Sequence, residues 1–132
     1  MILVDTCVLI DVVGTQCEWS AWSERELARW ARRGALLTNP IVFAELCSRF
    51  DSLQDVEAAA ASLRLSWAEL PRSALFLASR AHLQYRRRGG LKAMVLPDFL
   101  IGAHAAVSRL PLLTRDRRRF ETYFPTLQIV AP

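Results

Sequence analysis

The chain has 132 residues, is 52% hydrophobic and carries a formal net charge of +4, with 17 basic and 13 acidic residues. This length is typical of one compact domain, and the apolar content argues against a disordered chain. No apolar run reaches the roughly 18 residues that span a bilayer, and the N-terminus lacks the basic segment of a signal peptide. We therefore expect residues 1–132 to form a single cytoplasmic domain without membrane association.

The predicted elements alternate along the chain. A strand at 2–4 precedes a short helix over 8–10 that ends near Gly14, and a helix over 20–33 follows. A strand at 35–38 leads into a helix over 41–50, with Pro40 in its first turn. A helix capped by Asp51 or Ser52 extends to residue 63. The later elements are a strand at 65–70, a helix from Pro71 or Ser73 to the basic loop 86–90, a helix over 97–109, a strand at 111–114, a helix over 117–123 and a strand at 127–130.

This alternation of short apolar strands with helices predicts an α/β fold. Its central sheet should be mainly parallel, with right-handed crossover connections. The three cysteines, Cys7, Cys17 and Cys47, include no C-x-x-C pair. They indicate neither a disulfide framework nor a zinc site, and we expect reduced thiols.

Four carboxylates stand where burial or a strand end makes them unusual. Asp5, Glu45 and Asp98 are each the one charged residue in an apolar run, and Asp116 follows the strand at 111–114. A lone buried carboxylate is costly unless it is paired, hydrogen-bonded or bound to a metal. In open α/β sheets, ligands bind beyond the carboxyl ends of the strands. We expect the four acids to converge at that edge, where Mg²⁺ would relieve their repulsion.

Each acid also has a structural interpretation. Asp98 and Asp116 could cap helices, and Asp5 could accept hydrogen bonds from backbone amides of the next helix. Glu45 could pair with Arg49, one helical turn later. Unrelated structural needs would rarely place all four acids at one rim, so the set favours a functional site.

Basic residues flank two of these acids. Arg115, Arg117, Arg118 and Arg119 surround the last acid, and Arg86, Arg87, Arg88 and Lys92 precede the third. Both groups could bind phosphates, or could be solvated charged faces. His104 lies about 240° around a helix from Asp98, so we expect it to pack in the core or a dimer interface rather than act as a base.

The ordered set of motifs resembles the PIN-domain family, and specifically the toxin subunit of VapBC-type toxin–antitoxin pairs. The resemblance rests on M-I-L-V-D-T-C-V-L-I-D at 1–11, T-N-P-I-V-F-A-E-L at 38–46, L-P-D-F-L-I-G-A-H-A at 96–105 and L-L-T-R-D-R-R-R-F at 112–120. It covers nearly the whole chain. Some relatives carry a further acid where this chain has Arg119.

The resemblance implies a three-layer α/β/α sandwich, a single PIN domain over 1–132, and cleavage of RNA, such as tRNA or rRNA, with Mg²⁺ or Mn²⁺. It implies metal ligation by Asp5, Asp98 and Asp116, with Glu45 completing the catalytic acids and Thr114 orienting a ligand or water. A homodimer and a cognate VapB-type antitoxin are implied as partners.

Two other classes remain as alternatives. The first is a non-catalytic PIN-like module that binds RNA or protein. The second is a phosphatase or phosphoacceptor domain that uses Asp5. A haloacid-dehalogenase-like phosphatase needs D-x-D, and here the third position is Cys7. A receiver domain needs a lysine on its fifth strand, whereas Lys92 lies in the basic loop.

Overall fold

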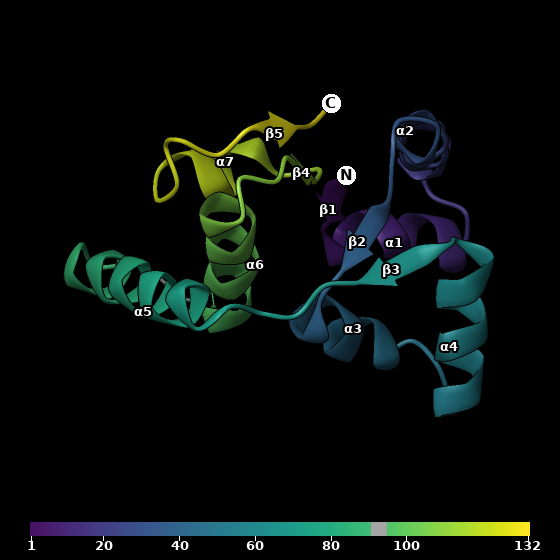
Figure 1. Cartoon of the computed structure of the whole chain (residues 1–132), viewed down its shortest axis with the longest axis horizontal. Coiled ribbons are helices and arrows are strands. Elements are labelled where there is room, and N and C mark those ends of the chain that lie inside the picture. Colours follow the sequence, from purple (N-terminus) through teal and green to yellow (C-terminus); the bar gives the residue numbers. More distant parts are fainter. Residues whose placement is uncertain (91–94) are drawn as a thin grey trace.

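One parallel sheet forms the centre of the molecule (Figure 1). The computed structural model describes residues 1–90 and 95–132, so Lys92 lies outside the described residues. The strands are β1 (Ile2–Val4), β2 (Leu36–Thr38), β3 (Leu65–Trp67), β4 (Leu112–Leu113) and β5 (Ile129–Val130). Their order is β3-β2-β1-β4-β5, and every neighbouring pair is parallel. The predicted mainly parallel sheet is confirmed.

Helices lie on both sides of this sheet, which confirms the predicted α/β/α arrangement. They are α1 (Thr6–Val13), α2 (Ser20–Ala31), α3 (Pro40–Cys47), α4 (Leu53–Ser62), α5 (Arg72–Arg87), α6 (Leu96–Val107) and α7 (Arg117–Glu121). In Figure 1, α2 lies above the β2–β3 part of the sheet, and α3 and α4 lie below it. Within the described ranges, no helix combines the length and apolar character needed to cross a membrane.

The strand predicted at 2–4 is confirmed as β1, and the other four strands are shorter than predicted, because each extends only as far as its partner. The ladder between β2 and β3 runs from the pair Leu36–Leu65 to the pair Thr38–Trp67. The strand expected at 65–70 therefore ends at Trp67, where β2 also ends. The first helix begins at Thr6, immediately after β1, rather than near residue 8.

Burial explains why the central strands are continuously apolar. Ile2, Leu3 and Val4 of β1 are fully buried, since helices cover both faces of the central strands. The edge strand β3 differs, because its Trp67 is 51% exposed. β2, β1 and β4 are the interior strands, and the carboxyl ends of β1 and β4 carry Asp5 and Thr114.

Gly102 allows α7 to pack closely on α6. A Cβ atom at this position would lie 2.4 Å from Phe124 Cε2 and 2.9 Å from Phe120 Cδ1. Those distances are too short for non-bonded carbon atoms. The side chains of Phe120 and Phe124 therefore occupy the space that a larger residue at 102 would fill, and this contact brings Arg119 next to α6.

Candidate active site

The parallel pairing of β1 with β4 places Asp5 beside Thr114. Leu3 pairs with Leu112 and Val4 with Leu113, and the Asp5 amide donates to the Leu113 carbonyl at 2.9 Å. The buried Thr114 hydroxyl then donates to Asp5 Oδ2 at 2.7 Å and accepts from the Asp116 amide at 3.1 Å. Thr114 thus orients Asp5 and fixes the loop that carries Asp116.

Asp5 is a buried carboxylate that does not serve as a helix cap. It occupies the N-cap position of α1 without a capping hydrogen bond and is only 7% exposed. Burial raises its pKa, and the charge of Asp98 adds to this, while hydrogen bonds from Thr114 and Cys7 act in the opposite direction. The folded protein therefore bears a cost for keeping Asp5 ionised.

Cys7 packs against the same carboxylate. Its Sγ lies 3.3 Å from Asp5 Oδ2. Burial, assisted by the charge of Asp5, raises the pKa of Cys7 to about 12. The thiol is therefore protonated at neutral pH and acts as a weak hydrogen-bond donor rather than a nucleophile.

Glu45 reaches the site from α3. The Thr6 hydroxyl donates a hydrogen bond to Glu45 Oε2. Partial burial raises the pKa of Glu45, and the charges of Asp5 and Asp98 raise it further. No ion pair joins Glu45 to Arg49, both of which the structure describes, so the predicted alternative for Glu45 is not realised.

Arg119 holds the other two acids. Its Nη1 lies 3.0 Å from Asp98 Oδ1, and its Nε lies 3.3 Å from Asp116 Oδ2. Asp116 is the N-cap of α7, as its structural alternative proposed, whereas Asp98 lies in the first turn of α6, whose N-cap is Val95. Asp98 Oδ2 accepts from the Val95 amide at 3.1 Å, and Asp116 Oδ1 accepts from the Arg119 amide at 3.1 Å.

Three of the four predicted acids border one hollow of about 510 Å³. We call this hollow the acid pocket. Its lining is Asp5, Thr6, Cys7, Ile10, Glu45, Ser48, Arg49, Asp98, Arg115 and Arg119. Asp116 lies beside the acid pocket and is connected to it through Arg119. The charge of Asp98 raises the pKa of both Asp5 and Glu45, and the charge of Asp5 raises the pKa of Glu45, so the three carboxylates interact electrostatically.

Arg115 is fixed at the wall of the acid pocket by Asp11. The Arg115 Nε atom lies 3.1 Å from Asp11 Oδ2 in an ion pair that lacks the alignment of a hydrogen bond. The same Asp11 oxygen accepts from the Ser23 hydroxyl at 2.7 Å. Asp11 is 4% exposed, so it is a structural anchor for the arginine.

A buried hydrogen bond joins the helices that carry Glu45 and Asp98. Asn39 Oδ1 caps α3 by accepting from the amides of Ile41 and Val42, at 3.0 and 2.9 Å. The Asn39 amide nitrogen therefore faces His104 of α6 and donates to His104 Nδ1 at 3.0 Å. Burial lowers the pKa of His104, which favours its neutral form. The expected packing role of His104, which is 2% exposed, is confirmed.

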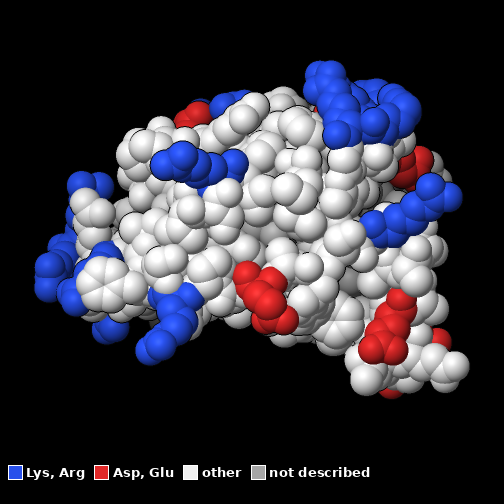
Figure 2. Space-filling view, in the orientation of Figure 1, with Lys and Arg blue, Asp and Glu red and all other residues white. Residues whose placement is uncertain are grey.

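Of the predicted basic residues, some lie at the acid pocket and others lie away from it. Arg115 lines the acid pocket, whereas Arg117 and Arg118 of α7 are exposed, and Arg117 pairs with Glu121. The exposed residues Arg86, Arg87 and Arg88 lie at the C-terminal end of α5. Figure 2 shows basic side chains over that end of α5 and a second group over α2. The fourth member of the loop group, Lys92, falls outside the described residues.

Sequence reasoning missed several residues that build this site. Thr6 and Arg119 were not predicted to contact the acids, because the contacts join elements far apart in the chain. Asp11 had a detectable signal, since it is the one charged residue of the apolar helix α1. That is the same feature by which Asp5 was recognised.

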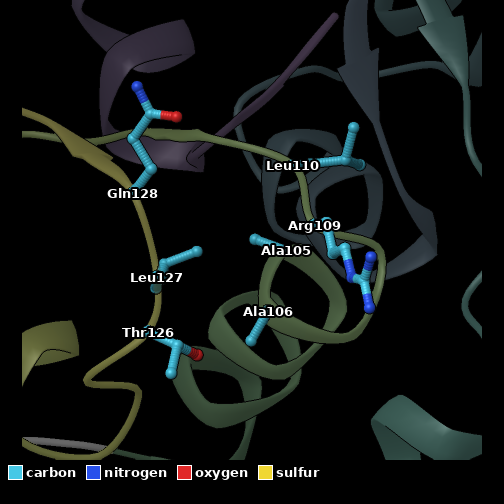
Figure 3. A pocket seen from close by; sticks show the side chains of 7 residues that line it. All are labelled: Ala105, Ala106, Arg109, Leu110, Thr126, Leu127 and Gln128. Carbon is cyan, nitrogen blue, oxygen red and sulfur yellow. The ribbon is translucent and has the colours of Figure 1, made fainter.

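A second hollow lies away from the acids. It is formed by the C-terminal part of α6 and the segment before β5 (Figure 3). Its lining is Ala105, Ala106, Arg109, Leu110, Thr126, Leu127 and Gln128. Arg109 is the one charged residue in this lining, so the second hollow lacks the carboxylates for metal chemistry.

The acid pocket suits a hard divalent cation in its donor chemistry, because carboxylate oxygens are the ligands that Mg²⁺ prefers. As the side chains lie, residues 1–90 and 95–132 contain no ready-made metal group of three or more His, Cys, Asp or Glu side chains. Asp98 and Asp116 instead face the guanidinium of Arg119. The side chains thus offer the type of oxygen ligand that a divalent cation binds, but Arg119 already contacts two of the four acids, Asp98 and Asp116.

Comparison with known proteins gives one family match and several similar folds. The PIN domain family model matches residues 2–124. VapBC2 from Rickettsia felis, solved with a promoter DNA fragment, has a TM-score of 0.74 at 18% identity and covers 99% of this chain and 98% of its own. VapBC-1 from nontypeable Haemophilus influenzae has a TM-score of 0.75 at 17% identity, with the same coverage.

A third similar structure is VapC20 from Mycobacterium tuberculosis, described as a Sarcin-Ricin loop cleaving toxin. Its TM-score is 0.64 at 17% identity, and the match covers 94% of this chain and 96% of that one. At such identities these structures establish the fold alone. No curated protein sequence matches the chain with significance.

Proposed function

The chain belongs to the PIN-domain family, and we propose that it is a metal-dependent endoribonuclease that hydrolyses RNA phosphodiester bonds in the acid pocket. The observation that carries the proposal is the meeting of Asp5, Glu45 and Asp98 at one hollow beyond the carboxyl ends of β1 and β4. Burial and mutual repulsion raise the pKa values of Asp5 and Glu45. Carboxylates with shifted pKa values cluster at functional sites, where catalysis uses the shift.

Asp5, Asp98 and Asp116 are the residues proposed to hold Mg²⁺ or Mn²⁺. A bound divalent ion would polarise the phosphate, lower the pKa of a coordinated water and stabilise the leaving oxygen. Thr114 orients Asp5 for this role through the 2.7 Å hydrogen bond to Oδ2. Because that bond occupies Oδ2, Asp5 would present Oδ1 to the pocket.

Glu45 is proposed to accept a proton from the attacking water. A general base works best when its pKa approaches the operating pH, and burial raises the pKa of Glu45 in that direction. The Thr6 hydroxyl bonds to Oε2, so the proton would be taken at Oε1. Thr6 thus holds the carboxylate in place during the reaction.

Arginines at the wall of the acid pocket are proposed to bind the RNA backbone. Arg49 and Arg115 line the pocket, and Asp11 holds Arg115 in position. Their charges offset the repulsion between four carboxylates and a phosphate chain. Arg117 and Arg118 would extend this contact, and Arg86, Arg87 and Arg88 would bind RNA farther from the cut. The proposed targets are structured RNAs, either tRNA or rRNA.

We further propose that the chain acts as a toxin, forms a homodimer and is neutralised by a VapB-type antitoxin. Support comes from the shared fold, since two of the similar structures are VapBC assemblies. Induction of the wild-type chain alone should arrest bacterial growth, and induction of Asp5→Asn should not. Light scattering on the purified chain should give twice the mass of one chain.

The decisive experiment is RNA cleavage by the purified chain, free of any co-purified partner. Total RNA and tRNA are incubated with Mg²⁺, Mn²⁺ or EDTA, using wild type, Asp5→Asn and the exposed control Asp51→Asn. We expect cleavage by wild type and Asp51→Asn with metal only, and none by folded Asp5→Asn. RNA binding without cleavage in any of these mixtures would favour the non-catalytic module.

A further inference from the structure

Arg119 contacts two of the four acids, Asp98 and Asp116, at the same time. Its Nη1 meets Asp98 Oδ1 at 3.0 Å, its Nε meets Asp116 Oδ2 at 3.3 Å, and its backbone amide donates to Asp116 Oδ1 at 3.1 Å. The arginine therefore bridges α6 and the N-terminus of α7 with one guanidinium. Its side chain is 36% exposed, so solvent screens the bridge only partly.

These contacts leave the four carboxylates in two different conditions. Both oxygens of Asp98 and of Asp116 are engaged, by Arg119 and by the amides of the two helix N-termini. Among the described residues, side-chain hydrogen bonds reach one oxygen of each of the other two acids: Thr114 and Cys7 donate to Asp5 Oδ2, and Thr6 donates to Glu45 Oε2. A cation that needs Asp98 or Asp116 must compete with a guanidinium that is already there.

Packing holds the arginine in this place. Arg119 is followed by Phe120, which is fully buried and lies against Gly102 of α6. Because Gly102 has no side chain, Phe120 and Phe124 can pack against it. This packing brings α7 close enough to α6 for Arg119 to reach Asp98. The bridge is thus a product of the fold.

We propose that Arg119 is an internal competitor of the divalent cation. By neutralising Asp98 and Asp116, it lowers the affinity of the acid pocket for metal, and it must leave Asp98 before that carboxylate can coordinate an ion. This inference rests on the proposed metal-dependent function. It goes further, in making metal loading depend on a residue that is not a ligand.

The test measures metal binding directly. Mn²⁺ is titrated calorimetrically into wild type, Arg119→Gln and Arg119→Lys, and bound Mn²⁺ is counted by electron paramagnetic resonance. The matched control is Arg115→Gln, which removes the same charge from the same pocket but breaks a pair with Asp11 instead of Asp98. Circular dichroism establishes that each variant is folded.

We expect Arg119→Gln to bind Mn²⁺ about tenfold more tightly than wild type, the change that follows from losing about 1.4 kcal/mol of competing interaction. Arg119→Lys keeps the charge without the two-pronged contact and should lie between them. Arg115→Gln should change the affinity less than about threefold, as a screened charge of the same sign does.

Three outcomes contradict the inference in distinguishable ways. Equal tightening in Arg119→Gln and Arg115→Gln would show a general charge effect and no competition. Unchanged affinity in Arg119→Gln would show that metal binds without Asp98 and Asp116. If Mn²⁺ bound to none of the variants, the metal site itself would be wrong, and the inference with it.

Discussion

Replacing Asn39 with alanine tests whether one buried hydrogen bond sets α3 against α6. Asn39 is completely buried, caps α3 through two amides, and donates to His104 Nδ1 at 3.0 Å. Loss of the cap costs about 1 kcal/mol. An unpartnered acceptor on buried His104 costs about 1–3 kcal/mol more. We therefore expect Asn39→Ala to lower the free energy of unfolding by about 2–4 kcal/mol, a large share of the roughly 5–15 kcal/mol of a typical domain.

The assay is urea denaturation, with the midpoint and slope fitted for each variant. Ser52→Ala is the matched control, because Ser52 caps α4 by accepting from the Asp55 amide at 3.1 Å and is exposed. Its loss should cost about 1 kcal/mol or less. A loss for Asn39→Ala no larger than for Ser52→Ala would refute the reasoning that the bond to His104 stabilises the helix pair.

Three further predictions follow from the site. Because burial raises the pKa of Asp5 above its unfolded value, ionisation opposes folding above the folded pKa, so Asp5→Asn should be more stable than wild type at pH 7. Chemical denaturation should show this difference shrinking as the pH falls toward the unfolded value near 3.8; a constant difference would mean a cause other than ionisation. Gly102→Ala should cost about 1–3 kcal/mol through overpacking against Phe124, measured by thermal melting; an unchanged melting temperature would contradict the close approach. In EDTA, Arg115→Ala should weaken RNA binding and reduce the salt slope by about 1, and Arg64→Ala, which changes an exposed arginine outside the acid pocket, should leave the slope unaltered.

The sequence was most informative where a charge interrupts an apolar run. The strand alternation predicted the parallel sheet, and the rule that ligands bind at the carboxyl ends of strands predicted that the four acids would converge at one edge. Three of them, Asp5, Glu45 and Asp98, line the acid pocket, and Asp116 lies beside it. These inferences need only local patterns and topology. Strand lengths were less accurate, because each strand ends with its partner, and the partner is not adjacent in the chain.

Side-chain pairing was the part that local patterns could not predict. Sixteen arginines are candidates for any carboxylate in this chain, and selecting Arg119 for Asp98 requires the close packing of α7 on α6. The contact of Asn39 with His104 could not be predicted for a similar reason, because 65 positions separate the two residues and only the fold brings them together. The departure from the family pattern at Arg119 was visible in the sequence, but its consequence for the acids was not.

The pairing of β1 with β4 also fixes when the acid pocket can form during synthesis. Asp5 is made 109 residues before its hydrogen-bond partner Thr114. Domains fold as units, and a nascent chain that lacks β4 and α7 has neither Thr114 nor Asp116 to offer. A nascent chain that ends before β4 therefore cannot carry out the chemistry of these carboxylates. The acid pocket can therefore assemble only after α7 has been synthesised and has left the ribosome.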